Sequence, residues 1–209
     1  MPRSELIARQ AAHPRGLLGE VVACAMAYDT ARVNRIALDY LRVEPAEAIL
    51  ELGFGSGRAL LQVAARALDG FVAGIDPSEI MVRHAKFRNG RYIRRGKMVL
   101  QLGEAAHIPY PDERFDKALA VHVLYFWRDP RKELREIRRV LRKGGLFLLG
   151  FRPKDDPAVV AQAPATVYTL HTIADVKELL EESGYEDVRT EADVDRGKQM
   201  AWAFGRKRS

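Results

Sequence analysis

Residues Ala48-Ile49-Leu50-Glu51-Leu52-Gly53-Phe54-Gly55-Ser56-Gly57-Arg58 form the stretch that decides the fold. The apolar run at its start predicts a strand that is buried on both faces, as in a parallel sheet. Its three glycines, at alternate positions, leave one side of a turn without any Cβ, so a ligand can lie against bare backbone. Apolar residues then recur at helical spacing from Leu60 to Leu68, which places the turn at a helix N-terminus. Such a strand-to-helix turn favours a nucleotide-like ligand.

The spacing of these glycines narrows the kind of ligand. The pattern G-x-G-x-G differs from the G-x-G-x-x-G of dinucleotide-binding enzymes and from the phosphate loop of nucleoside triphosphatases. No Lys-Ser or Lys-Thr follows it, and Glu51 stands directly before it, where a diphosphate would be repelled. An acid at this position suits a ligand with a cationic end. The alternative is that the glycines serve only to make a tight turn.

Length and composition describe an ordinary globular protein. A chain of 209 residues with 47% hydrophobic and 30% charged residues suits one α/β domain with a full core. The single cysteine, Cys24, excludes an internal disulfide and a cysteine-based zinc site, and its apolar neighbours predict a buried thiol. No metal site is expected. No apolar run reaches the roughly 18 residues of a membrane span, and no signal-peptide core is present, so we expect a cytoplasmic protein.

The net charge of +6 is concentrated in two segments, Arg83 to Lys97 and Arg131 to Lys143. In the second segment basic residues alternate with apolar ones, which predicts an amphipathic helix with a solvated basic face. This face could serve solubility alone, or it could attract an anionic membrane or nucleic acid. No aromatic residues interleave it, so a nucleic-acid partner is poorly supported.

The order of the expected elements defines the fold class. Residues 1–42 look helical, and residues 1–45 would form a cap on residues 46–209, within a single domain. Beyond the cap, strands alternate with helices, which indicates an α/β, doubly wound, mostly parallel sheet. A final hairpin makes the last strand antiparallel. We expect strands at about 48–53, 71–76, 98–102, 115–121, 146–151, 185–194 and 198–206, and helices at about 57–69, from Pro77 to the Asn89-Gly90 turn, up to Lys143 before Gly144-Gly145, and at 172–180.

Several polar residues fall at the carboxyl ends of the expected strands, where open α/β sheets bind ligands. Asp76 could accept hydrogen bonds from a ribose diol, or it could cap the following helix. Glu104 could accept from an exocyclic amine of adenine, or it could be an exposed loop acid. Met81 could pack against a base, or it could belong to the core. His122 ends the fourth strand, so Asp76, Glu104 and His122 are expected to lie near the glycine loop.

Taken together, these motifs resemble those of class I S-adenosylmethionine-dependent methyltransferases, in particular the small ubiquinone/menaquinone-biosynthesis (methyltransferase type 11) group. The resemblance rests on Glu51 to Gly57, Asp76, Gly103-Glu104-Ala105, Phe115-Asp116 and Leu141-Arg142-Lys143-Gly144-Gly145. It implies a seven-stranded sheet in the order 3-2-1-4-5-7-6. Two departures are that the family often has Asp at position 104, and that the Asn-Pro-Pro-Tyr-like motif of amino-group DNA methyltransferases is missing after strand four.

The resemblance also implies which residues bind the cofactor, S-adenosyl-L-methionine. The acid and the glycines would line its methionine part, Asp76 would hold the ribose, and Glu104 with Ala105 would read the adenine. His122 would lie beside the transferable methyl group. The full implied set is Glu51, Gly53, Phe54, Gly55, Gly57, Asp76, Pro77, Met81, Glu104, Ala105 and His122.

The expected chemistry is in-line displacement at a sulfonium methyl, for which the protein mainly aligns the reactants. A general base is optional. His122 and Tyr125 are candidates and His171 is a poorer one, but His122 could equally be a cofactor-contacting or core histidine. The first hypothesis for the acceptor is a small apolar or aromatic molecule. Alternatives are a phospholipid headgroup or RNA reached through the basic surface, or a protein that binds the cofactor without turnover.

Overall fold

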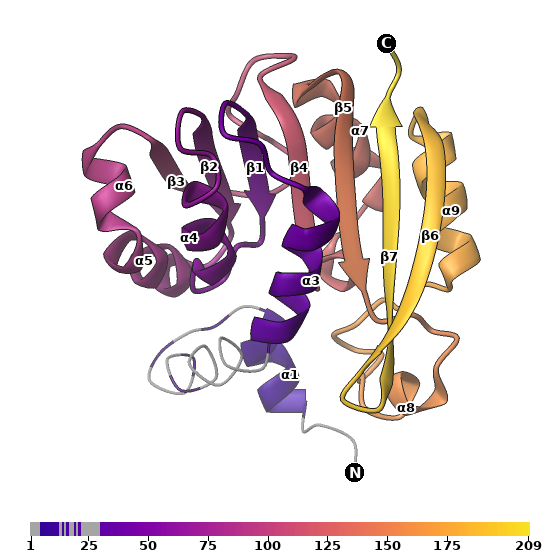
Figure 1. Ribbon diagram of the computed structural model, residues 1–209. Helices are drawn as coiled ribbons and strands as arrows, with labels where there is room; N and C mark the ends of the chain where they lie inside the picture. The colour runs from indigo at the N-terminus through magenta and orange to yellow at the C-terminus, as the bar shows by residue number, and fades with distance from the viewer. Residues whose placement is uncertain (1–4, 13, 15, 17–18, 20, 22–29) are drawn as a thin grey trace.

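The computed structural model describes residues 5–12, 14, 16, 19, 21 and 30–209 and contains a seven-stranded sheet (Figure 1). Its order, β3-β2-β1-β4-β5-β7-β6, confirms the expected sheet, and β7 runs antiparallel to both of its neighbours. The strands are β1 (Ala48–Leu52), β2 (Phe71–Asp76), β3 (Met98–Leu102), β4 (Phe115–Val121), β5 (Leu141–Phe151), β6 (Tyr185–Asp195) and β7 (Lys198–Lys207).

Helices cover both faces of the sheet, because successive side chains of its central strands point to opposite faces. Ile49 belongs to the core on the side of α3 and α4, whereas its neighbour Leu50 belongs to the core on the side of α7 and α9. The described helices are α1 (Glu5–Ala12), α3 (Ala31–Leu41), α4 (Arg58–Ala64), α5 (Glu79–Arg88), α6 (Gly90–Arg94), α7 (Pro130–Val140), α8 (Pro157–Val160), α9 (Ile173–Glu182) and the short 3-10 helix η1 (Leu124–Phe126).

The boundary between α7 and β5 differs from the prediction. The helix ends at Val140, and the strand begins at Leu141, so Gly144-Gly145 lies inside β5 and does not end the helix. The register shifts between Phe115 and Lys117, where one residue of β4 lies opposite residues 142–145 of β5, so both glycines are part of a bulge in β5. A Cβ on Gly145 would lie 2.8 Å from the Arg142 carbonyl oxygen, so only glycine fits this irregularity.

Three other local expectations are corrected. Helix α4 ends at Ala64, five residues earlier than expected. Ser78, and not Asp76, is the N-cap of α5, because the Ser78 hydroxyl accepts the N–H of Met81. The Asn89-Gly90 turn is the junction of two helices, since α6 begins at Gly90.

Part of the cap falls outside the described residues. The buried thiol expected at Cys24 and most of the helix expected around it belong to that part. Of the cap, α1 and α3 are described, and α3 packs against α4, β4 and β5 (Figure 1). Within the described ranges, no helix is both long and apolar enough to cross a membrane.

Candidate cofactor and acceptor site

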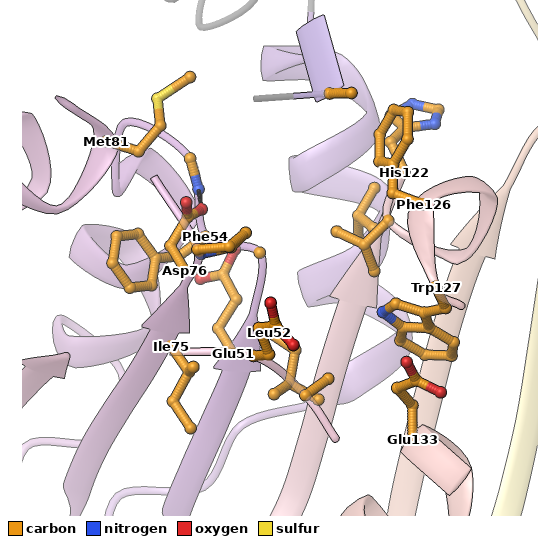
Figure 2. A pocket seen from close by; sticks show the side chains of 18 of the residues that line it. Glu51, Leu52, Phe54, Ile75, Asp76, Met81, His122, Phe126, Trp127 and Glu133 are labelled. Atoms are coloured by element: carbon orange, nitrogen blue, oxygen red, sulfur yellow. Dashed lines mark hydrogen bonds between the residues drawn. The ribbon is translucent and has the colours of Figure 1, made fainter. Parts of the chain in front are cut away.

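A cavity of about 890 Å³ lies at the carboxyl ends of β1, β2, β3 and β4 (Figure 2). Parts of the cap, including Ala11, Thr30 and Asn34, line it as well, so cap and core share one site. Gly57, Tyr125 and His171 are not among its lining residues. The structure brings together every other residue of the expected cofactor set: Glu51, Gly53, Phe54, Gly55, Asp76, Pro77, Met81, Glu104, Ala105 and His122.

The three glycines of the loop have different reasons to be glycine. All have positive φ, at +66°, +53° and +72° for Gly53, Gly55 and Gly57. A Cβ on Gly53 would lie 2.1 Å from Cγ1 of Val123, and one on Gly57 would lie 2.7 Å from Cβ of Ala85. A Cβ on Gly55 would meet no atom within 4 Å. Gly53 and Gly57 thus make room for protein side chains, whereas Gly55 leaves open space beside the loop. That a ligand lies against the backbone of all three stays a prediction.

Asp76, at the tip of β2, holds the loop and the next helix together. Its Oδ2 accepts the Gly55 N–H at 2.8 Å, and its Oδ1 accepts the Ser78 N–H at 2.9 Å. Burial raises the pKa of this carboxyl to about 6, although both hydrogen bonds lower it. A carboxylate has about four acceptor sites, so Asp76 can also accept from a ligand.

Glu51 is the least satisfied acid of the cavity. It is 5% exposed, and its Oε2 has no hydrogen-bond partner among the described residues. Burial, and then the nearby Asp76, raise its pKa to about 8. A buried carboxyl of this kind is costly to ionise unless a cation sits beside it. The site thus fits a cofactor with a cationic end, as the resemblance implied.

His122 lines the cavity from the other side and has an unusual backbone. Its φ is +59°, a left-handed conformation that histidine tolerates better than most residues. Its N–H donates to the Gly150 carbonyl at 2.8 Å, and its Nδ1 lies 3.1 Å from the Tyr125 hydroxyl. Burial raises the pKa of Tyr125 above its usual range, so the phenol holds its proton near neutral pH. A part for Tyr125 as general base stays a prediction.

The cavity also contains residues outside the expected cofactor set. Phe126 is the last residue of η1 and Trp127 follows it, and both line the cavity across from Glu51 (Figure 2). Glu133, in the first turn of α7, is 6% exposed, and its Oε2 has no partner within the described part of the chain. Burial raises its pKa. Its place among the alternating charges of α7 gave no local signal of burial.

The basic face of α7 is largely engaged within the protein. Arg131 pairs with Glu182, and Arg142, which lies in β5 just beyond the helix, is 2.6 Å from Asp116. Arg139 pairs with carboxylates on two segments, and Arg138 donates to a backbone carbonyl. The expectation that this basic face is simply solvated is therefore corrected, because several of its arginines have partners within the protein. In the described ranges, no group of three or more His, Cys, Asp or Glu side chains could hold a metal ion.

Comparisons with known proteins agree with this fold. A family profile described as "Methyltransferase domain" matches residues 50–149. The "Uncharacterized methyltransferase YdaC" of Bacillus subtilis is 28% identical over 163 residues, which cover 78% of this chain and 84% of that protein. The "O-methyltransferase cnsE" of Penicillium expansum is 31% identical over 153 residues, covering 70% of this chain but 55% of that protein. The crystal structure of a SAM-dependent methyltransferase from Aquifex aeolicus has a TM-score of 0.68 at 20% identity, covering 83% of this chain and 89% of that one.

Proposed function

Because this chain belongs to the class I S-adenosyl-L-methionine-dependent methyltransferases, we propose that it transfers a methyl group to a small apolar or aromatic acceptor. The observation that carries the acceptor class is the wall opposite Glu51 and Asp76. This wall contains Phe126 and Trp127 beside His122 (Figure 2). Aromatic side chains in the wall of a cavity are typical of sites for small organic ligands.

Each strand tip has a proposed part in holding the cofactor, which supplies a methyl group already activated on a cationic sulfur. Glu51, with its unpaired oxygen, meets the cationic end. Asp76 accepts from the ribose, and Gly55 leaves the space in which the ligand lies. Glu104 and Ala105, after β3, approach the adenine.

The remaining contribution of the protein is alignment and exclusion of water. Holding an acceptor in line with the transferable methyl can lower the barrier by roughly 7–11 kcal/mol. When the acceptor is an anion, transfer of the methyl group from the cationic sulfur neutralises charge. An enclosed cavity with aromatic walls therefore favours the reaction. The cap supports this role, because Ala11, Thr30 and Asn34 line the cavity together with the strand ends.

The proposal is tested with the purified full chain by calorimetric titration with S-adenosylmethionine and S-adenosylhomocysteine. We expect Asp76→Ala to weaken binding of both at least tenfold, because it removes the acceptor at the tip of β2. The matched control is Asp69→Ala, since Asp69 is an exposed acid near the opposite end of the same strand. Transfer of a labelled methyl group is then measured on a panel of phenols, hydroxyquinones and phospholipids. Equal affinity in both variants would contradict the cofactor site, and methylation of phospholipids alone would contradict the acceptor class.

A further inference from the structure

We propose that the outer face of α5 and α6 binds an anionic membrane surface, with Phe87 entering the bilayer interface and the surrounding cations meeting the lipid headgroups. This inference goes beyond the proposed function, and its test needs neither the cofactor nor an acceptor. The surface, called here the α5–α6 face, consists of the exposed residues Arg83, Lys86, Phe87, Arg88, Arg91, Arg94 and Arg95.

The charge of the α5–α6 face has a single sign. Residues 83–97 contain seven Lys and Arg and no Asp or Glu. Arginines of α7 pair with carboxylates, whereas Lys86, Arg94 and Arg95 have no ion-pair partner within the described ranges. Their charge is therefore not neutralised by the protein. It attracts an anionic surface within about one Debye length, roughly 10 Å at 0.1 M salt.

Phe87 is the apolar part of this face. Its side chain is 92% exposed, the highest value among the large hydrophobic residues that the structure describes. One exposed ring needs no explanation by itself. This ring, however, follows Lys86 directly, and Arg83 lies four residues before it on the same helix, so their side chains are neighbours. An aromatic residue among lysines and arginines is typical of helices that lie in a membrane interface.

The two helices hold this surface in a fixed shape before any partner binds. Val82 and Ala85 of α5 and Tyr92 of α6 are buried in the core on the side of α3 and α4, so the other side of both helices faces solvent. Asn89 joins the helices, and its buried amide donates to the Ala85 and Gly57 carbonyls. Figure 1 shows α5 and α6 beyond β3, at one end of the sheet. Because no part of this face has to fold on binding, little ordering entropy opposes it.

Other occupants fit this face less well. A second copy of the chain would bring like charges together. The core of a protein interface is apolar and poor in charged residues. Residues 79–97 are all described, and Phe87 is their single exposed large hydrophobic side chain, too little for such a core. Single-stranded nucleic acid is held by several aromatic rings that stack on successive bases, and this face offers one ring.

The first experiment measures sedimentation of the full chain with vesicles of phosphatidylcholine, with or without about 30% phosphatidylserine, at about 0.1 M salt. We expect binding to the anionic vesicles alone, weaker as salt rises. A basic residue near an anionic surface strengthens binding roughly fivefold. The double variant Arg94→Ser, Arg95→Ser should therefore bind at least tenfold more weakly.

The matched control removes the same charge elsewhere, by Arg135→Ser on α7 together with Lys177→Ser on α9. Both control residues are exposed, and this variant should lose less than threefold. No binding to anionic vesicles, equal binding to neutral vesicles, or equal losses in the two double variants would overturn the inference.

The second experiment tests insertion of the ring. Phe87→Ser should weaken vesicle binding at least fivefold, whereas Leu68→Ser, which removes a 65% exposed side chain outside this face, should leave it unchanged. Phe87→Trp should keep the affinity, and its added fluorescence should shift to shorter wavelength on anionic vesicles. All these substitutions are at exposed positions, and thermal unfolding checks that each variant is folded. An unshifted emission, or Phe87-dependent binding of an oligouridine without binding of vesicles, would contradict the membrane assignment.

Discussion

Cofactor binding should release a proton from Glu51. The pKa of this buried carboxyl is about 8 in the structure, against an ordinary value of 4.5. At pH 7 the side chain is therefore about nine-tenths protonated before the ligand arrives. A cation placed next to a carboxyl lowers its pKa by roughly 1–3 units. With a fall of about two units, binding at pH 7 releases about 0.8 proton.

The same shift makes the ligand-free protein sensitive to pH. The folded state holds the Glu51 proton more tightly than the unfolded state. The stabilisation of the folded state by this proton is fully present below pH 4.5 and is lost as pH rises through about 8. At pH 7 the loss amounts to about 3 kcal/mol, as an upper estimate for one buried acid. Glu51→Gln removes this dependence, and we expect the ligand-free variant to unfold at a higher temperature than the wild type at pH 8.

Calorimetry measures the proton release. S-adenosylmethionine is titrated into the full chain at pH 7 in phosphate and in Tris, whose ionisation enthalpies differ, and the slope of the observed heat gives the number of protons. We expect no slope for Glu51→Gln and the wild-type slope for Glu178→Gln, since Glu178 is an exposed acid on α9. Asp76, with a pKa of about 6, contributes little at this pH. A wild-type heat that is independent of buffer, or a Glu51→Gln slope equal to that of the wild type, would refute the reasoning.

Three further substitutions test other parts of the site and the fold. Gly53→Ala should lower the free energy of unfolding by about 2–3 kcal/mol in thermal denaturation, because its Cβ would lie 2.1 Å from a methyl group. Gly55→Val has open space around its Cβ, so it should destabilise by only about 1–2 kcal/mol but weaken binding of S-adenosylhomocysteine at least tenfold in calorimetry. Asp195→Asn should cost about 3–5 kcal/mol in chemical denaturation at pH 7, since the buried Asp195 lies 2.6 Å from Arg152. Burial raises the pKa of Asp195, but hydrogen bonds from two arginines bring it below the ordinary value. The contribution of this carboxylate is thus present above its unfolded-state pKa, and the difference from Asp195→Asn should shrink as pH falls through the folded-state value.

The strands of the sheet could be predicted because the sequence patterns that indicate them are local. Apolar runs of five to seven residues, bounded by turn residues, gave the limits of β2, β3 and β4 as the structure has them. The boundary between α7 and β5 was not predictable in this way. Lys143 continues the basic pattern of the helix, but the backbone already extends at Leu141, which pairs with Phe115. The Nζ of Lys207 also donates a hydrogen bond to the Leu141 carbonyl at 2.8 Å. No local sequence pattern predicts a contact between residues so far apart in the chain.

The location of the site was predictable from topology, whereas its internal geometry was not. The carboxyl ends of parallel strands meet at one edge of a sheet, so residues such as Asp76, Glu104 and His122 had to lie near each other. Which glycine borders open space depends on Val123, 70 positions after Gly53 in the sequence, and could not be deduced locally. The burial of Tyr125 likewise depends on packing between distant segments.

Binding of a cationic cofactor and binding of an ionised acceptor favour each other in this cavity, which has a consequence for the order of binding. Glu51 ionises readily only when a cation is beside it, and an acceptor that reacts as an anion is attracted by the same cation. Opposite charges attract more strongly in an enclosed cavity than in water. An ionised acceptor that enters before the cofactor meets a neutral Glu51 and an uncompensated loss of solvation. The same acceptor entering afterwards faces a cationic sulfur, so the cavity favours cofactor first and acceptor second.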